Sequence, residues 1–252
     1  MWTERQAVEI FHLTFLCNFG TRVDKALFAL KGGCNLRFFH RSTRYSEDMD
    51  LDLRTMAPGT LRSNVEAVLS SDAFRHGLRA QGLEVSSASA PKQTQTNQRW
   101  KITLQDLGSG TAIPTKIEFS RRALEDGAEL APVESELIRR YKLYPVIVQR
   151  YSALAALKQK ISALALRPGT QARDLFDLAL LIDAGAANVD IGNRARELLP
   201  KAIDNAMSIG FEEFKGQVVA FLEPGHQDEY RGRADWEKLH DTVIAALEEL
   251  AR

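Results

Sequence analysis

The sequence predicts an α+β fold, in which a mixed β-sheet core with flanking helices is followed by a C-terminal helical bundle. Two observations support this prediction. Up to residue 150, short apolar or alternating segments of the strand type lie between segments with helical periodicity. From Tyr151 onward, nearly every segment has the periodicity of a helix. We therefore predict two domains, an α/β core over 1–150 and a helical domain over 151–252.

Two helices are predicted in the first 80 residues. The first covers residues 5–18, where apolar side chains recur at helical spacing, and Gly20 ends it. Pro58 is well placed to open the second, which continues to Leu78 before Gly82 stops it. Both helices present one apolar face, so we expect each to cover the sheet.

The strands of the first half are short and apolar or alternate with period two. The predicted strands are 27–31, 49–53, 100–104 and 115–119. We expect a helical turn over 34–40 and a hairpin-like turn at 108–110. Residues 86–98 are polar and poor in hydrophobic side chains, which predicts a mobile loop.

The second half is interrupted only at glycine and proline positions. The predicted helices are 151–166, 171–184, 193–208, 211–222 and 234–251. Neither an internal repeat nor a heptad array is visible in the sequence. A helical bundle is the expected result.

The composition excludes several classes of protein. Lys+Arg and Asp+Glu number 33 each, which excludes a wholly basic nucleic-acid coat. Residues 1–149 carry 20 basic and 17 acidic side chains and residues 150–252 carry 13 and 16, so a polyanion should prefer the first half. The two cysteines are too few for a disulfide framework. The chain has neither a signal-peptide pattern nor an apolar run of the ~18–20 residues that cross a bilayer, so we expect a cytoplasmic protein with no membrane partner.

The segment Asp48–Asp52 is the most informative for chemistry. In a strand, its three aspartates Asp48, Asp50 and Asp52 share one face, and the apolar residues between them face the core. Like charges in a row repel, and a divalent cation relieves that repulsion. Oxygen ligands without nearby His or Cys suit Mg²⁺ or Mn²⁺. A calcium loop is excluded, because its sixth and twelfth positions would be Leu53 and Gly59.

Gly32 and Gly33 lie at the end of a predicted strand. Such a pair lets the backbone approach a phosphate closely and present its N–H groups, although an ordinary turn also explains it. The surrounding residues match neither a Walker A loop nor a Rossmann glycine motif. The glycine pair followed by the aspartate strand is far more specific than either feature alone.

Together these segments resemble the nucleotidyltransferases of the DNA polymerase β superfamily, and more closely the AbiEii/AbiGii toxin group. The first motif is carried by Lys31–Leu36 (KGGCNL) and Arg44–Asp50 (RYSEDMD). The later signature is carried by Lys160–Leu164 (KISAL), Arg167 and Arg173–Leu178 (RDLFDL). The resemblance implies a nucleotidyltransferase-like sheet core.

The resemblance extends in order and spacing over roughly residues 27–182, and the remaining residues match only as a helical tail. It has two mild departures. Cys34 stands where Thr or Ser is more usual, and Phe176 stands where Tyr is common. Neither position is a metal ligand in the motif.

The resemblance implies that Asp48 and Asp50 are catalytic and hold the metal, and that a third carboxylate lies on a neighbouring strand. Glu118 is the best candidate, because alternation puts it on the polar face between Ile117 and Phe119. The alternative is an ordinary cross-strand Lys–Glu pair on a solvated sheet face. Asp52 is not used by the motif.

The resemblance also implies a nucleotide-binding set from both halves of the chain. Its members are Gly32, Gly33, Arg44, Ser46, Lys160, Arg173 and Asp174. Lys160 could instead be a surface lysine, and Asp174 could be an acid favoured by the helix dipole. Arg44 belongs to a basic run that could equally be a solvated face. For Asp177, we favour a structural role.

The activity implied is metal-dependent transfer of a nucleoside monophosphate from an NTP to an RNA acceptor, such as the 3′ end of tRNA. The cofactor would be Mg²⁺ or Mn²⁺. The resemblance further implies a toxin restrained by a separately encoded antitoxin protein. Two alternatives stay open: a nucleotidyltransferase that modifies a protein or a small molecule such as an antibiotic, and a catalytically silent binding module of the same fold.

Overall fold

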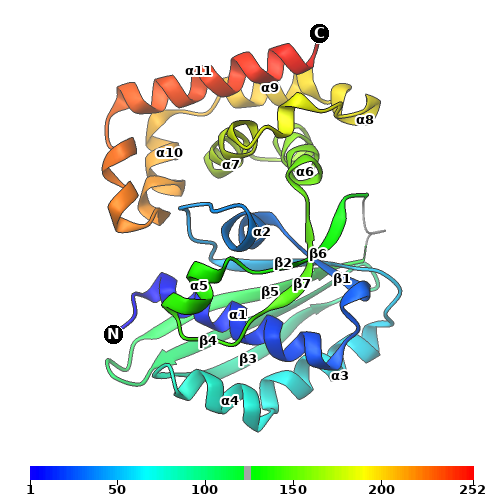
Figure 1. Ribbon diagram of the computed structural model, residues 1–252, viewed down its shortest axis with the longest axis vertical. Coiled ribbons are helices and arrows are strands. Elements are labelled where there is room, and N and C mark those ends of the chain that lie inside the picture. The colour runs from blue at the N-terminus through cyan, green and yellow to red at the C-terminus, as the bar shows by residue number, and fades with distance from the viewer. Residues whose placement is uncertain (122–125) are drawn as a thin grey trace. The chain divides into compact units, whose positions relative to one another are not determined.

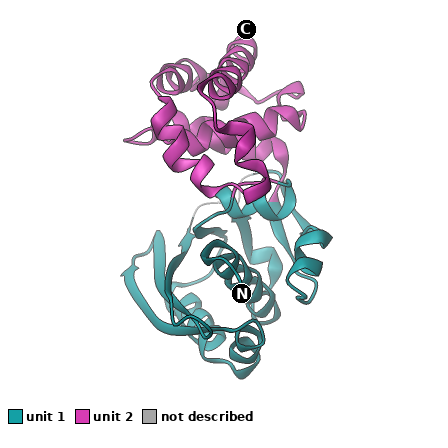
Figure 2. Ribbon diagram, turned by 90° about the vertical axis from the view of Figure 1, so that its left-hand side faces the viewer, with its two compact units in different colours: residues 1–41, 45–150 teal, residues 42–44, 151–252 magenta. Residues whose placement is uncertain are grey.

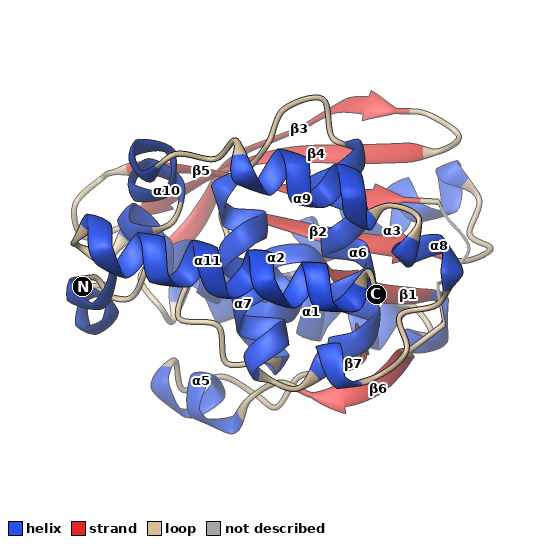
Figure 3. Ribbon diagram, turned by 90° about the horizontal axis from the view of Figure 1, so that it is seen from above, coloured by secondary structure: helices blue, strands red, loops and turns tan. Residues whose placement is uncertain are grey.

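The computed structural model describes residues 1–121 and 126–252. The chain forms two compact units, shown in different colours in Figure 2. The first unit contains residues 1–41 and 45–150, and the second contains 42–44 and 151–252. The predicted α+β class is confirmed: a mixed sheet with helices forms the first unit, and the second unit is helical (Figure 3).

The described residues form one seven-stranded sheet in the order β3-β4-β5-β2-β1-β7-β6 (Figure 1). Its strands are β1 (Phe28–Lys31), β2 (Asp48–Leu53), β3 (Leu83–Gln93), β4 (Asn97–Asp106), β5 (Ala112–Ser120), β6 (Ala128–Pro132) and β7 (Ile147–Tyr151). The central strand β2 is antiparallel to β1 and parallel to β5. The two motif-bearing strands β1 and β2 are therefore neighbours in the middle of the sheet.

Helices cover both faces of this sheet. They are α1 (Glu4–Arg22), α2 (Gly32–Phe39), α3 (Pro58–Ser70), α4 (Asp72–Arg79) and α5 (Ser135–Arg140), with a 3-10 turn η1 (Lys25–Leu27). In Figure 1, α2 lies on one face, and α1, α3 and α4 lie on the other. Phe19 of α1 meets Phe119 of β5 at a ring-centroid distance of 5.4 Å, so the aromatic core lies on the α1 side. Side chains of opposite parity on β5, such as Glu118, therefore face the α2 side.

The prediction of a mobile loop over 86–98 was wrong, because β3 and the start of β4 occupy these residues. Among the described strands, β3 is an edge strand that pairs with β4 alone, and most of its side chains are exposed. An exposed edge does not need the alternating apolar residues by which strands are recognised. Its small Ser and Ala side chains therefore concealed a strand.

The single helix predicted over 58–78 is instead two helices separated at Ser71. The Ser71 side chain accepts a hydrogen bond from the backbone N–H of Phe74, which starts α4. Serine is a favoured residue at a helix start, because its oxygen satisfies an otherwise unpaired N–H. No element was predicted for residues 121–150, where the structure has β6, α5 and β7.

The second unit is built from six helices in the described residues. They are α6 (Ala153–Leu166), α7 (Ala172–Asp183), α8 (Asn193–Arg196), α9 (Leu199–Met207), α10 (Phe211–Gln217) and α11 (Arg233–Leu250). Short 3-10 turns η2 (Ala186–Asn188), η3 (Val219–Phe221), η4 (Pro224–His226) and η5 (Asp228–Tyr230) connect them. The predicted helix over 193–208 is divided into α8 and α9. None of the described helices is long and apolar enough to cross a membrane.

A buried polar cluster fastens α2 to α1 and α5 in the first unit. The Arg37 guanidinium donates to both carboxylate oxygens of Glu9, at 2.6 and 3.2 Å. The Tyr141 hydroxyl also donates to Glu9, at 2.5 Å. Arg37 and Glu9 are 5% and 3% exposed, so water does not replace either partner when the other is lost. The position of α2 therefore depends on this pair.

We expect Glu9→Ala to lower the free energy of unfolding by about 3–5 kcal/mol, because it leaves the Arg37 charge buried without its partner. Urea denaturation measures this loss. The matched control is Glu66→Ala, which breaks the exposed Arg62–Glu66 pair within α3 and should cost less than about 1 kcal/mol. Equal losses of unfolding free energy in the two variants would contradict the conclusion that burial makes the Glu9–Arg37 pair important for stability.

Candidate active site

The predicted acids lie side by side on the two central parallel strands. In the β2–β5 register, Asp50 lies opposite Glu118, and Asp48 lies opposite Lys116. Because side chains alternate along a strand, all three carboxylates share the face on which α2 lies. The register thus places Asp48, Asp50 and Glu118 on one face of two neighbouring strands, as we expected from the sequence.

Two of the three carboxylates have basic partners. Lys116 Nζ lies 2.7 Å from Asp48 Oδ2, and Arg99 Nε lies 2.6 Å from Glu118 Oε2. The Asn97 amide donates to the other oxygen of Glu118 at 2.6 Å. A cross-strand pair of a basic side chain with Glu118, the alternative to a ligand role, is thus present, with Arg99 of β4 in place of a lysine. Arg99 and Asn97 were not identified from the sequence, because their contact with Glu118 depends on the β4–β5 register.

The pKa values of these acids follow from their surroundings. Burial raises the pKa of Asp50, and the charge of Lys31 opposes that effect. The carboxylates of Glu118 and Asp48 raise the pKa of Asp50 further. Burial alone would also raise the pKa of Glu118, but its hydrogen bonds bring that pKa below the usual value. Lys31 itself forms an ion pair with Asp52. Of these two acids, Asp50 therefore has the raised pKa and Glu118 the lowered one.

The chemistry of the donor set suits a divalent cation, because three carboxylates lie on one face and the pKa of Asp50 is raised by burial and by the charges of the other two. The positions of the three side chains do not yet form a metal site. Among the residues that the structure describes, no group of three His, Cys, Asp or Glu side chains is placed to hold a metal ion. The ion pairs of Asp48 with Lys116 and of Glu118 with Arg99 engage two of the three predicted ligands.

Gly32 begins α2 directly beside the acids. Its φ of +65° favours glycine, and a Cβ built on it would lie 3.3 Å from Asp50 Oδ2. Lys31 precedes the helix and makes no side-chain hydrogen bond to its first turn. The first N–H groups of a helix carry partial positive charge and readily bind an anion such as phosphate. Gly32 and Gly33 therefore lie where a phosphate group could meet both the helix start and the acids.

A buried hydrogen-bond network supports the start of β2. The Ser46 hydroxyl donates to the Asp48 carbonyl at 2.9 Å. The Thr115 hydroxyl donates to the Glu47 carbonyl at 2.7 Å and accepts from His12 Nε2 at 2.9 Å. Burial lowers the pKa of His12 to about 3, so this imidazole is neutral. The sequence offered no signal for His12, because Thr115 is 103 residues away in the chain.

The remaining predicted residues lie in the second unit, where Arg44, Lys160 and Asp174 belong to one buried ion-pair network. Lys160 Nζ lies 2.8 Å from Asp174 Oδ1 and 2.5 Å from Asp177 Oδ2. Arg44 Nη2 lies 3.1 Å from Asp177, and Arg167 Nη1 lies 2.6 Å from Asp174. Asp174 and Asp177 are 1% and 0% exposed. The network joins α6 and α7 to the segment 42–44.

Burial would raise the pKa of Asp177, but the charges of Arg44 and Lys160 hold it below the usual value. This agrees with the structural role predicted for Asp177. Arg173 is different from the other motif residues, since its side chain makes no hydrogen bond or ion pair with any described residue. It is also partly exposed.

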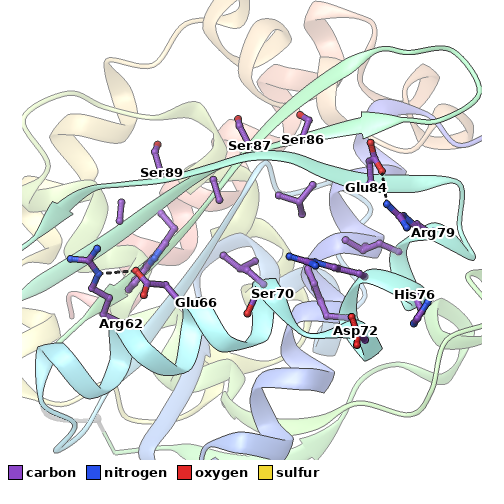
Figure 4. A pocket seen from close by; sticks show the side chains of 18 residues that line it. Arg62, Glu66, Ser70, Asp72, His76, Arg79, Glu84, Ser86, Ser87 and Ser89 are labelled. Carbon is purple, nitrogen blue, oxygen red and sulfur yellow. Dashed lines mark hydrogen bonds and ion pairs between the residues drawn. The ribbon is translucent and has the colours of Figure 1, made fainter.

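A cavity of about 650 Å³ lies elsewhere in the first unit, between α3, α4 and β3 (Figure 4). None of the predicted site residues lines it. Two of its arginines, Arg62 and Arg79, are paired with Glu66 and Glu84, as the dashed lines of Figure 4 show. Such paired charges attract a triphosphate poorly. The acid-bearing face of β2 and β5 is therefore the better candidate site.

The model of a protein family described as "Nucleotidyl transferase AbiEii toxin, Type IV TA system" matches residues 14–249. The chain belongs to the AbiEii family. This confirms the resemblance found in the sequence, and it makes the protein a transferase of a toxin–antitoxin family.

Two solved structures from Helicobacter pylori are similar to this AbiEii chain. The structure of JHP933 has a TM-score of 0.57 at 18% identity, over 97% of this chain and 94% of that chain. A protein described as a candidate nucleotidyltransferase has a TM-score of 0.57 at 17% identity, over 98% of both chains. At such identities the likeness concerns the fold. No curated protein sequence matches the chain.

We expect Gly32→Ala to lower the free energy of unfolding by about 1–2 kcal/mol, because an L side chain is strained at positive φ. The new methyl group would also press on the Asp50 carboxylate, so the KM for NTP should rise. Gly59→Ala in α3 is the control, since nothing lies within 4 Å of its Cβ. An unchanged KM in folded Gly32→Ala would argue against a phosphate site at this helix start.

We expect Asp177→Asn to cost roughly 3–5 kcal/mol at pH 7, because Arg44 and Lys160 lose a buried counter-charge. Since the folded-state pKa of Asp177 is lowered, its contribution is complete above the ordinary value of 3.8 and is lost as the pH falls below it. The difference in urea stability between wild type and variant should therefore shrink in acid. Asp183→Asn, on the exposed end of the same helix, should change little at either pH.

Proposed function

We propose that this AbiEii protein transfers a nucleoside monophosphate from an NTP to an RNA acceptor, with Mg²⁺ or Mn²⁺ held by Asp48, Asp50 and Glu118. The observation that carries the proposal is the juxtaposition of Asp50 with Glu118 in the β2–β5 register, directly beside the glycine start of α2. Carboxylates for a cation and free helix N–H groups for an anion at one place suit a metal–triphosphate complex.

The chain's own residues would orient the substrates. The N–H groups of Gly32 and Gly33 would donate hydrogen bonds to the β- and γ-phosphates, and the Ser46 hydroxyl holds the loop that precedes Asp48. Glu118 would take the proton of the acceptor hydroxyl. The oxygen of that hydroxyl would bond to the α-phosphorus, and pyrophosphate would leave. The bound cation would supply charge neutralisation at the α-phosphate.

In the second unit, we propose Arg44, Lys160, Arg173 and Asp174 as the nucleotide-binding set. Their contributions would differ. Arg44, Lys160 and Asp174 are tied into the buried network, so they would act by holding α6 and α7 in place. The guanidinium of Arg173 is the group of this set that remains available to a phosphate.

We propose in addition an RNA acceptor such as tRNA, a cytoplasmic location and a separately encoded antitoxin. The antitoxin is supported by the family, whose description names a type IV toxin–antitoxin system. The acceptor could instead be a protein or a small molecule such as an antibiotic. A silent binding module is less well supported, because the full acid set Asp48, Asp50 and Glu118 is present on one face.

Incubation of the protein with each α-labelled NTP, Mg²⁺ and either total RNA or RNA-free lysate tests the proposal. We expect label in the tRNA band with one of the four nucleotides. Label in protein or in a small metabolite would instead support the alternative acceptors. A complete lack of incorporation in every mixture would favour the silent module.

We expect Asp50→Asn to reduce incorporation at least about 100-fold while the fold persists, because the substitution is nearly isosteric and removes like-charge repulsion. Circular dichroism and urea denaturation check the fold, and labelled-nucleotide incorporation measures activity. Asp52→Asn is the matched control two residues on: it loses the Lys31 pair and some stability, but should keep activity. If Asp52→Asn is inactive and Asp50→Asn active, the assignment of ligands is wrong by two residues.

A further inference from the structure

The acid-bearing face holds nearly as much positive as negative charge. Asp48 is paired with Lys116, and Glu118 is paired with Arg99. Asp50 lies between them in the sheet and has no ion pair among the described residues. The carboxylate oxygens that a cation would need are therefore the same atoms that bind Lys116 Nζ and Arg99 Nε.

These two ion pairs differ in exposure from the buried ion pairs that hold the helices of the molecule. The side chains of Lys116 and Arg99 are 35% and 33% exposed. Arg37 and Arg44, which serve buried pairs, are 5% and 6% exposed. An exposed lysine or arginine can turn its head group into water at little cost, whereas a buried one cannot. The two pairs at the acids can therefore open without unfolding the sheet.

A divalent cation at the same carboxylates would lie within a few ångströms of two positive head groups. Like charges at such distances repel strongly even in a partly hydrated site. The cation and the two basic side chains thus compete for one set of oxygens. The competition also explains why no described group of three ligands is already gathered, since Lys116 and Arg99 each engage one of the acids.

We propose that Lys116 and Arg99 are displaceable counter-ions of the active site: a divalent cation binds by replacing them at Asp48 and Glu118, and their freed head groups then face the triphosphate. This inference rests on the proposed function and adds how the metal site is controlled. Metal and NTP would bind cooperatively, because phosphate oxygens give the displaced lysine and arginine new partners. The protein would hold a cation weakly until NTP arrives.

The test measures Mn²⁺ binding to the full chain without nucleotide, by electron paramagnetic resonance of free Mn²⁺. We expect Lys116→Gln and Arg99→Gln each to bind Mn²⁺ about 10-fold more tightly than wild type, because one competing charge is gone. Lys92→Gln is the control: it removes the same charge from the edge strand β3, where Lys92 has no ion pair with a described residue, and should shift the affinity less than about 2-fold.

A second readout concerns the coupling with nucleotide. Adding an NTP analogue that cannot be cleaved should tighten Mn²⁺ binding in wild type, and this gain should be smaller in Lys116→Gln. Circular dichroism confirms that each variant is folded, and the Arg99 variant provides an independent reading if Lys116→Gln fails to fold.

The outcomes separate the two proposals. Unchanged or weaker Mn²⁺ binding in folded Lys116→Gln and Arg99→Gln overturns the counter-ion inference. The metal site itself still stands if wild type binds Mn²⁺ and Asp50→Asn does not. If neither wild type nor any variant binds Mn²⁺, with or without the analogue, both the inference and the metal-dependent function are overturned.

Discussion

The parallel register of β2 with β5 is the constraint on which the site depends, because it sets the carboxylates of Asp50 and Glu118 beside each other. That register is held by the opposite face, where Leu51 and Phe119 are fully buried. A slip of one residue would turn acids into the core and apolar side chains into water, at a cost of several kcal/mol. The hydrophobic core therefore enforces the electrostatic conflict between the two acids.

The molecule contains two kinds of ion pair that compensate its acidic side chains. The burial of a pair determines whether it can separate. The pair of Glu9 with Arg37 is almost inaccessible to water and acts as a permanent fastening of α2. The pair of Lys116 with Asp48 is partly open to water, so its cost of separation is small. Permanent pairs position the helix start that would receive phosphate, while separable pairs lie where a cation would enter. Ion pairs of the same chemical type thus fix the position of α2 in one place and can separate from each other in another.

Local sequence was enough to predict β1, the glycine pair at its end and β2, because period-two alternation and a glycine pair are visible within a few residues. That α2 begins at Gly32 itself was not predicted, since a helical turn was expected only from Cys34. Glu118 was proposed because the resemblance implies a third carboxylate, and alternation places Glu118 on the polar face of its strand. Arg99 and His12 could not be found in this way. Their contacts with Glu118 and Thr115 join segments 19 and 103 residues apart, and they exist only once the strands and helix α1 are packed. The edge strand β3 escaped notice because an exposed strand lacks the apolar pattern that marks a buried one.

The motif of the second unit shows that a run of charged residues does not by itself distinguish a nucleotide-binding role from a structural one. Lys160, Asp174 and Asp177 are the residue types that nucleotide binding uses, but they are also what a buried ion-pair network requires. Burial distinguishes the two uses: both aspartates are nearly inaccessible, and each has two basic partners. A charge that is fully compensated inside the protein has little field left for a ligand. We therefore propose that contact with phosphate falls to the guanidinium of Arg173, which lies outside the network, while its neighbours hold the helix that carries it in place.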